Sequence, residues 1–368
     1  MANNITLHQK NNTGSYDNLY PRTTADHTIL TETTSDKYGL TGGNAEEVVV
    51  IYMNYISIVG IVKIYVKDPS GNPVVGAIAQ GIQGNPVTNS SGFVSGILVS
   101  NPVIVKSPYI DLKDSSVDVT DYIGTTVAVN VVLSAVADGA ILRYTTSTNV
   151  KFNGVAKTID VCCVGGGGGG GSYFVQGSEY HKGGGGGGGA IVNGYGIAVT
   201  ANTPYLASVG VGGAVGQTAG AGGTTSFMSV SAPGGGGAYM SSETGSTGGG
   251  RGGVAGLTGC GDGGSERETI DGGSNTTISE FDDGKTFYSG GGGAGVWGQG
   301  NQASGGSPNG ADGGYIHVTG AYEATVSDAS TPGIGGGGGG GAYWHSGAMV
   351  ANPSSGGSGL VAIRIHTS

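Results

Sequence analysis

Residues 158–171 read Thr-Ile-Asp-Val-Cys-Cys-Val followed by seven glycines, Gly165–Gly171, and this stretch decides how the rest of the chain is interpreted. The seven-glycine run recurs at Gly183–Gly189 and at Gly335–Gly341. Of the 81 glycines in 368 residues, 67 follow residue 160. Such a proportion is typical of collagen or of low-complexity chains, but no strict Gly-X-Y period is present. A collagen triple helix is therefore excluded.

The glycine runs allow two interpretations. One is a flexible linker, because glycine loses more freedom on folding than any other residue and has no side chain to bury. The other is a set of polyproline-II-like helices packed against one another. Such a helix has three residues per turn and no internal hydrogen bonds, so every N–H and C=O points sideways and needs a partner on a neighbouring segment. Only glycine lets backbones approach that closely.

The spacing of aromatic residues favours the ordered interpretation. Each of four glycine runs leads into a short insert and then returns to glycine, and a plain linker has no use for aromatic residues in such inserts. We therefore predict four glycine hairpins whose turns meet at one tip. The candidate receptor-binding residues in these turns are Tyr173, Phe174, Tyr180, His181, Tyr239, Met240, Trp297, Tyr343, Trp344 and His345.

Packed glycine helices with variable loops at one end resemble the receptor-recognition domain of bacteriophage tail-fibre adhesins. The strand-like segments Thr158–Val164 and Gly356–Ile365 look like the paired end strands of the glycine-rich domain that closes many phage tail proteins. The resemblance covers about residues 141–368. It implies a non-enzymatic adhesin without cofactor or metal, located in the virion and made in the host cytoplasm. It also implies a homotrimer as the common state of fibres, although the bundle could be complete within one chain.

Composition limits the partners. The net charge of −10 argues against nucleic-acid phosphate as a ligand. The first residues lack the basic and apolar regions of a signal peptide. Three cysteines, two of them adjacent, do not form a disulfide framework. On a strand, Cys162 and Cys163 face opposite sides, and we expect both to be small buried hydrophobic residues.

The chain before the glycine runs divides in two. Residues 1–45 are polar and are either a mobile tail or an arm ordered against a partner; Thr6–Gly14 with Leu19–Pro21 looks similar to the openings of tail-fibre proteins, which attach to other tail or baseplate proteins. Residues 46–138 predict a β-sandwich, because short β-branched segments alternate with turn signals. The series from Val66 to Gly92 resembles the transthyretin-like, carboxypeptidase-regulatory-like module, which serves as a spacer. The apolar run at 48–62 is too short and too rich in β-branched residues for a membrane span.

Residues 139–368 form the third predicted domain, the glycine-rich receptor-binding domain. The overall fold class is mostly β. Within the third domain, we expect the strand-like pieces at 191–230 and 315–325 to lie at the base, beside the paired end strands.

Catalytic and metal-binding motifs are mostly missing from the sequence. Val161–Val164 before glycines mimics a dinucleotide fingerprint, but that fingerprint needs a helix next. Gly259–Gly264 hints at a calcium-binding repeat that occurs only once. His181 and His345 could contact a ligand or a metal, although a plain surface imidazole is the simpler interpretation. Spaced acids such as Glu266 and Asp271 leave a glycosidase formally open.

Three functions remain. The first is a receptor-binding protein whose tip aromatics contact a glycan or an outer-surface protein of a bacterium, as antibody loops contact antigens. In a second interpretation of the tip, the aromatics only cap the bundle. The alternative functions are a surface-polysaccharide depolymerase and an elastic, matrix-like glycine protein. The last of these predicts no stable fold.

Overall fold

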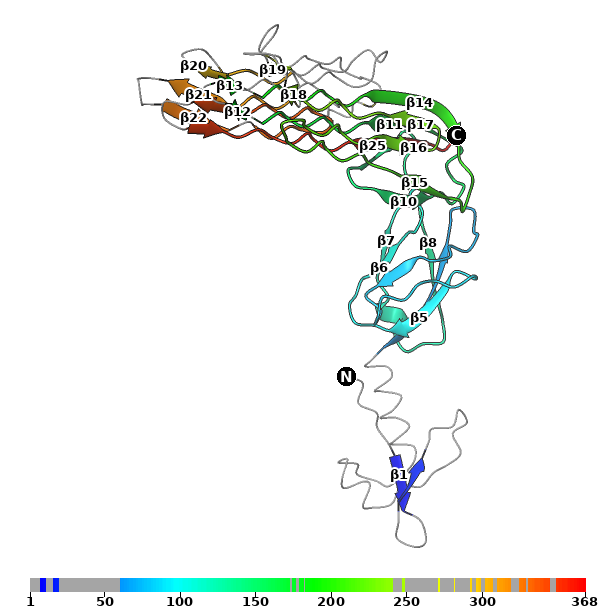
Figure 1. Ribbon diagram of the computed structural model, residues 1–368. Coiled ribbons are helices and arrows are strands. Elements are labelled where there is room, and N and C mark those ends of the chain that lie inside the picture. The colour runs from blue at the N-terminus through cyan, green and yellow to red at the C-terminus, as the bar shows by residue number, and fades with distance from the viewer. Residues whose placement is uncertain are drawn as a thin grey trace. The chain divides into compact units, whose positions relative to one another are not determined.

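The computed structural model describes residues 7–10, 16–19, 60–172, 174–176, 179–181, 183–240, 247–248, 271, 281, 292, 296–298, 302–306, 310–318, 324–328, 330–344 and 349–368. The chain forms two compact units. Unit 1 comprises residues 1–108 and 113–134, and unit 2 comprises residues 109–112 and 135–368. Both are built from β-strands (Figure 1), and a 3-10 turn spans Thr120–Tyr122.

Unit 1 contains a hairpin and two three-stranded sheets. The hairpin lies in the predicted N-terminal arm, and the sheets have the strand orders β5-β3-β8 and β4-β6-β7. The strands are β1 (Leu7–Lys10), β2 (Tyr16–Leu19), β3 (Ile61–Lys67), β4 (Ile78–Gln80), β5 (Phe93–Ile97), β6 (Val103–Lys106), β7 (Ser115–Val117) and β8 (Val129–Val132).

The core of unit 1 is made by side chains that alternate along the strands. Val62, Ile64 and Val66 on β3 are fully buried, whereas the residues between them face outward. The same period of two buries Val103 and Val105 on β6. This alternation is typical of strands with one face on a core and one face in water.

Two turns of unit 1 follow one design. Asp68 accepts hydrogen bonds from the backbone N–H groups of Ser70 and Asn72 at 2.9 and 2.8 Å. Asn89 accepts in the same way from Ser91 and Phe93 at 2.9 and 3.1 Å. Each side chain thereby closes an Asx turn, which fixes the path between two strands.

Unit 2 contains a four-stranded antiparallel sheet and several two- or three-stranded pieces. Its strands are β9 (Ile141–Tyr144), β10 (Thr148–Lys151), β11 (Thr158–Val164), β12 (Phe174–Gln176), β13 (Glu179–His181), β14 (Ile191–Ala198), β15 (Pro204–Ala207), β16 (Thr225–Phe227), β17 (Val230–Ala232), β18 (Tyr239–Met240), β19 (Thr247–Gly248), β20 (Val296–Gly298), β21 (Tyr315–Val318), β22 (Ala324–Ser327), β23 (Ala342–Trp344), β24 (Met349–Ala351) and β25 (Leu360–His366). The four-stranded sheet has the order β14-β11-β25-β9. We call it the base sheet.

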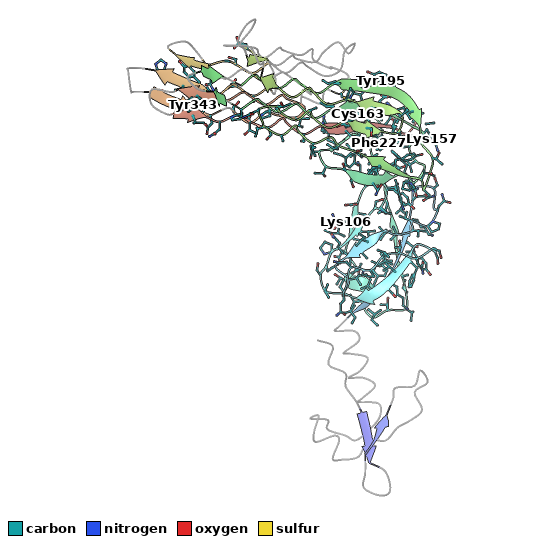
Figure 2. The ribbon with its side chains drawn as sticks, viewed as in Figure 1. Lys106, Lys157, Cys163, Tyr195, Phe227 and Tyr343 are labelled. Carbon is teal, nitrogen blue, oxygen red and sulfur yellow. The ribbon has the colours of Figure 1, made fainter. Side chains whose placement is uncertain are left out.

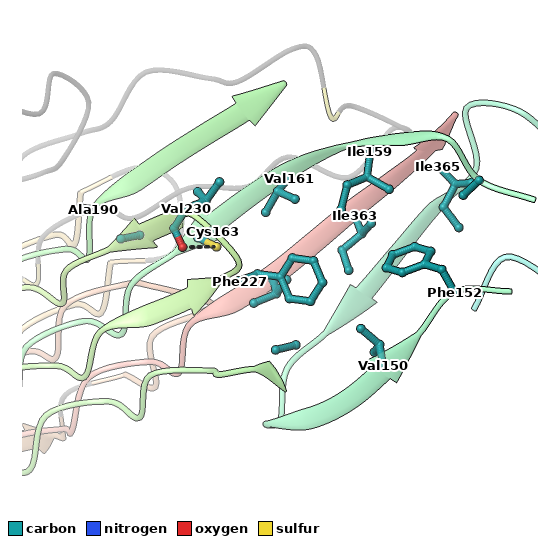
Figure 3. Packing of buried hydrophobic residues seen from close by; sticks show 14 residues of the cluster. Val150, Phe152, Ile159, Val161, Cys163, Ala190, Phe227, Val230, Ile363 and Ile365 are labelled. Atoms are coloured by element: carbon teal, nitrogen blue, oxygen red, sulfur yellow. Dashed lines mark hydrogen bonds between the residues drawn. The ribbon is translucent and has the colours of Figure 1, made fainter. Parts of the chain in front are cut away.

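The two central strands of the base sheet, β11 and β25, are buried on both faces. On one face, Ile159, Val161 and Cys163 of β11 pack with Ile363 of β25 and with Phe227 (Figure 3). On the other face, Cys162 and Val164 pack with Phe281 and Leu360. The prediction that Cys162 and Cys163 face opposite sides as buried, unlinked residues is confirmed.

Pairing of the end strands is also confirmed. β11, which leads into Gly165–Gly171, pairs antiparallel with β25 along its whole length, from Thr158 opposite His366 to Val164 opposite Leu360. β14 lies on the other side of β11, and β16 and β17 pack beside β11, so the expected place at the base is right for these strands of residues 191–230. The expectation for residues 315–325 is wrong for the strands that the structure describes there, because β21 pairs with β20 and β22 and packs beside β23 and β24. β21 follows a glycine segment that leads away from the base sheet.

Candidate functional site

The central feature of unit 2 is Gly165–Gly171, whose N–H groups donate to three different neighbours in rotation. The partner returns every third residue, and all three neighbouring segments, 184–190, 216–223 and 354–357, run antiparallel to the donor run. The N···O pairs are Gly165–Ala190 2.8 Å, Gly168–Gly187 2.8 Å, Gly171–Gly184 2.9 Å, Gly166–Gly223 2.9 Å, Gly169–Gly220 3.0 Å, Ser172–Gly216 2.9 Å, Gly167–Gly357 2.9 Å and Gly170–Ser354 3.0 Å.

The carbonyl groups of the same run accept from three further segments. Gly166 and Gly169 accept from the segment 235–238, Gly168 and Gly171 accept from 338–341, and Gly167 accepts from Gly213 at 2.8 Å. The first two segments run parallel to the central run. The run is therefore enclosed by six neighbours, and its buried backbone groups are paired laterally, as buried peptide groups must be.

Close approach explains why these positions are glycine. A Cβ added at Gly165, Gly166 or Gly167 would overlap the carbonyl oxygen of Pro233, Val211 or Gly336, respectively. Each obstacle is backbone, which cannot move aside without breaking the neighbour's own hydrogen bonds. The obstacle also returns every third residue, because Gly168 would meet Gly236 in place of Pro233.

The other two seven-glycine runs belong to the same arrangement. Gly183, Gly186 and Gly189 donate to Gly341, Gly338 and Gly335 at 2.7 to 2.8 Å, which pairs the second run with the third in antiparallel order. All three runs are buried. A flexible linker does not have this set of bonds, so that interpretation is wrong for these three runs.

A family profile for a glycine-rich domain matches residues 144–366, which is more than half of the chain. The chain belongs to the glycine-rich domain family. No curated protein matches its sequence significantly.

One end of the glycine-rich domain gathers short strands from distant parts of the sequence. We call it the distal end and define it by β13, β20, β21, β22, β23 and β24. β23 packs beside β13, β20 and β21, and β24 packs beside β21 and β22. Figure 1 shows β20, β21 and β22 at the opposite end of unit 2 from the base sheet. The glycine segments connect these two ends.

The predicted binding residues are distributed over the distal end and one further hairpin. Backbone pairing places Phe174 opposite His181, Val175 opposite Tyr180, Tyr343 opposite Val350 and Trp344 opposite Met349. Trp297 lies on β20, opposite Ile316 of β21. Three of the four predicted turns thus contribute strands that pack together.

The fourth predicted turn lies elsewhere in unit 2, and the structure describes few of the predicted side chains. Tyr239 and Met240 form the hairpin of β18 with β19, which Figure 1 shows nearer to the base sheet than β20–β22. Tyr343 is half-buried, and Figure 2 shows it far along unit 2 from Tyr195 and Lys157. Tyr173 and His345 lie outside the described residues, and for the remaining predicted residues the structure gives the backbone only.

Two residues at the distal end were missed by sequence reasoning. Tyr315 and His317 on β21 share a face, and the Tyr315 hydroxyl lies 2.7 Å from His317 Nδ1. The glycine segment that precedes β21 could have indicated their position at the distal end. Ala311 and Gly314 donate to Gly337 and Gly340, so this segment runs parallel to the third glycine run and leaves at the same end.

The titratable groups of the base sheet have a structural role. Burial raises the pKa of both Cys162 and Cys163 to about 12, which keeps them as inert thiols. Burial alone would raise the pKa of Asp160, but the Gly196 N–H, His366 and Arg364 together lower it below its usual value. Arg364 also stacks 4.7 Å over the Phe281 ring.

Within the described ranges, no group of His, Cys, Asp and Glu side chains is arranged to hold a metal ion. The same ranges contain no helix long and apolar enough to cross a membrane.

Proposed function

We propose that this chain is a phage tail-fibre receptor-binding protein that adheres to a bacterial surface receptor and carries out no reaction on it. The observation that carries the proposal is the gathering of β13, β20 and β23 at the distal end. These strands hold Tyr180, Trp297 and Tyr343, and they come from three separate parts of the sequence. Large aromatic residues among Ser, Gly and Asn supply contact area at low entropy cost, which suits a recognition surface.

The scaffold in this proposal is a bundle of polyproline-II-like glycine helices closed by the base sheet. Support comes from the change of hydrogen-bond partner with a period of three, since a polyproline-II helix has three residues per turn. The six neighbours of Gly165–Gly171 match a helix that points one N–H and one C=O sideways at every third of a turn. Such a bundle would hold the distal strands rigidly without using side chains.

The two sheets of unit 1 fit a sandwich spacer, because each sheet alternates buried and outward residues. Residues 1–45, which include the β1–β2 hairpin, would attach to other tail or baseplate proteins. A homotrimer in the virion would raise a weak interaction per site through several copies. A glycan or an outer-surface protein would be the receptor, with no nucleic acid, no cofactor and no membrane insertion.

A cell-binding experiment tests the proposal. The full-length protein is labelled fluorescently and offered to a panel of bacterial strains. We expect it to bind some strains and not others, and we expect the double variant Tyr343→Ala with Trp344→Ala to lose that binding. The matched control is Tyr195→Ala, which removes an exposed tyrosine of β14 in the base sheet.

Two further measurements on the same proteins separate binding from capping and from catalysis. If the double variant melts at a much lower temperature and binds in proportion to its folded fraction, the aromatics act as caps. If the wild-type protein releases sugar fragments from purified surface polysaccharide, the depolymerase is the better description. Binding to no strain would contradict the proposal.

A further inference from the structure

The distal end contains a polar cluster that lies outside the predicted aromatic turns. Tyr315 and His317 are both half-buried on one face of β21, and their ring centroids are 5.8 Å apart. The two rings also share the 2.7 Å hydrogen bond between the Tyr315 hydroxyl and His317 Nδ1. When the phenol donates this bond, the proton of a neutral imidazole resides on Nε2, so His317 presents a donor on its other edge.

Two hydroxyl side chains lie on the same face. In the antiparallel ladder of β21 with β22, Tyr315 is directly opposite Ser327 and His317 is directly opposite Thr325. Directly opposite residues of an antiparallel pair project to the same side of the sheet. Ser327 and Thr325 are exposed. The face therefore offers two aromatic rings and, on the neighbouring strand β22, two hydroxyl groups.

The position of this face joins it to the recognition surface. β21 packs beside both β23 and β24, and β22 packs beside β24. Tyr343 on β23 is thus carried by a strand next to the one that carries Tyr315 and His317. The opposite face of β21 is closed, because Ile316 is fully buried.

The charged residues near β21 in the sequence indicate which class of ligand this face could bind. The sequence contains no lysine or arginine from residue 286 to residue 363, whereas Asp312, Glu323 and Asp328 lie in that range. Within that range, a phosphate- or carboxylate-bearing ligand would meet acidic residues and no lysine or arginine. An uncharged ligand with hydroxyl groups and apolar C–H faces suits rings edged by hydroxyls and an imidazole.

We propose that Tyr315, His317, Thr325 and Ser327 form a subsite for a neutral sugar of a bacterial surface polysaccharide. The inference rests on the proposed receptor-binding function and names its ligand class. The tyrosine and histidine rings would cover the C–H face of a pyranose, and His317 Nε2 with the two hydroxyls would bond its hydroxyl groups. The hydrogen bond between the rings fixes the orientation of both before the sugar arrives, which lowers the entropy lost on binding.

The test uses the full-length protein on an array of purified bacterial surface polysaccharides, neutral and acidic, together with whole cells of the same strains. The variants are His317→Ala, Tyr315→Phe and Thr325→Val, with Tyr195→Phe as the control at the base sheet. We expect the wild-type protein to bind at least one neutral polysaccharide and its strain. We expect His317→Ala to weaken both by about tenfold, as befits the loss of a hydrogen bond and a stacking surface. Tyr195→Phe should leave both unchanged.

The outcomes distinguish this inference from the broader function. If cells bind the wild-type protein and all three variants equally, the subsite is wrong and the receptor-binding function stands. If the wild-type protein binds only acidic polysaccharides, with an affinity that falls steeply as salt is raised, the neutral ligand class is wrong. If neither cells nor polysaccharides are bound, both proposals fail. Should His317→Ala lower the melting temperature, the exposed Thr325→Val variant decides, because a substitution there has little effect on folding.

Discussion

Unit 1 and the glycine segments of unit 2 are stabilised by opposite means. In unit 1, side chains such as Val62, Ile64 and Val66 fill the core, and the backbone is paired within ordinary sheets. In unit 2, Gly165–Gly171 has no side chain at all, and backbone groups of six neighbouring segments form the interior. Removing atoms should therefore destabilise unit 1, whereas adding atoms should destabilise the glycine segments of unit 2.

The largest effect should come from adding one carbon to the glycine interior. In Gly168→Ala, the new Cβ would overlap the Gly236 carbonyl, and Gly236 also accepts a hydrogen bond from Gly187 at 2.9 Å. Since the obstacle is backbone, we expect a loss of more than about 4 kcal/mol in the stability of unit 2, which amounts to failure to fold. Calorimetry of the full chain would show one thermal transition lost and one retained.

The matched control is a glycine of unit 1. Gly71 has φ +85°, and no heavy atom lies within 4 Å of a Cβ added there. Gly71→Ala meets only conformational strain, which costs about 1–2 kcal/mol. If Gly168→Ala proves as mild as Gly71→Ala, the glycine interior is not closely packed and the comparison fails.

Removing atoms from unit 1 tests the other half of the comparison. Ile64 is fully buried at the centre of β3, and Ile64→Ala leaves a cavity. We expect unit 1 to lose about 2–5 kcal/mol while the transition of unit 2 keeps its midpoint. Urea unfolding followed by hydrogen exchange would assign the loss to one unit. Equal destabilisation of both units would show that they do not unfold separately.

Unit 2 also contains a buried carboxylate, whose oxygens accept hydrogen bonds from backbone N–H groups. Asp111 is fully buried and accepts from the N–H groups of residues 153–156 at 2.7 to 3.1 Å. In Asp111→Asn, an amide NH₂ would face some of these donors. We expect a loss of about 2–3 kcal/mol in unit 2, measured by chemical denaturation. A loss no greater than that of an exposed control such as Asp138→Asn would contradict this role.

Much of this fold could be predicted from the sequence because the decisive constraints are local. Seven glycines in succession can be ordered only by backbone hydrogen bonds, because they have no side chains to bury. The alternation of apolar and polar residues in β3 predicts a strand with one face buried. The opposite facing of Cys162 and Cys163 follows from the period of two along any strand. The Asx turns at Asp68 and Asn89 follow from side chains that close their own backbone.

The remaining features could not be predicted, because the local sequence of a strand does not determine at which end of the domain the strand lies. Tyr315-Ile316-His317-Val318 has the same strand pattern whether it lies at the base or at the distal end. The hydrogen bonds of Ala311 and Gly314 to the third glycine run decide the matter, and those are pairings with residues about 26 positions away. The role of Asp111 could not be predicted for the same reason, because the N–H groups that donate to it lie 42 to 45 residues further along the chain.

The smallest effect concerns acid and the pairing of β11 with β25. Asp160 Oδ2 lies 2.9 Å from His366 Nε2 and 3.6 Å from Arg364, and Asp160 Oδ1 accepts from the Gly196 N–H at 2.9 Å. Burial raises the pKa of this carboxyl, but these partners outweigh burial and lower it from 3.8. A carboxyl with a lowered folded-state pKa contributes stability that is fully present above its unfolded pKa. That contribution is lost as the pH falls through the folded value.

The melting temperature of unit 2 in the wild-type protein should therefore fall as the pH drops below the usual carboxyl pKa of 3.8, and this fall should be shallower in Asp160→Asn. Asp118→Asn is the matched control, since Asn101 and Thr120 lower the pKa of Asp118 to about 2 in unit 1. It should change the acid response of unit 1 alone. If Asp160→Asn leaves the acid response of unit 2 as steep as before, the base sheet is held by its apolar faces, and the ion pair adds nothing to them.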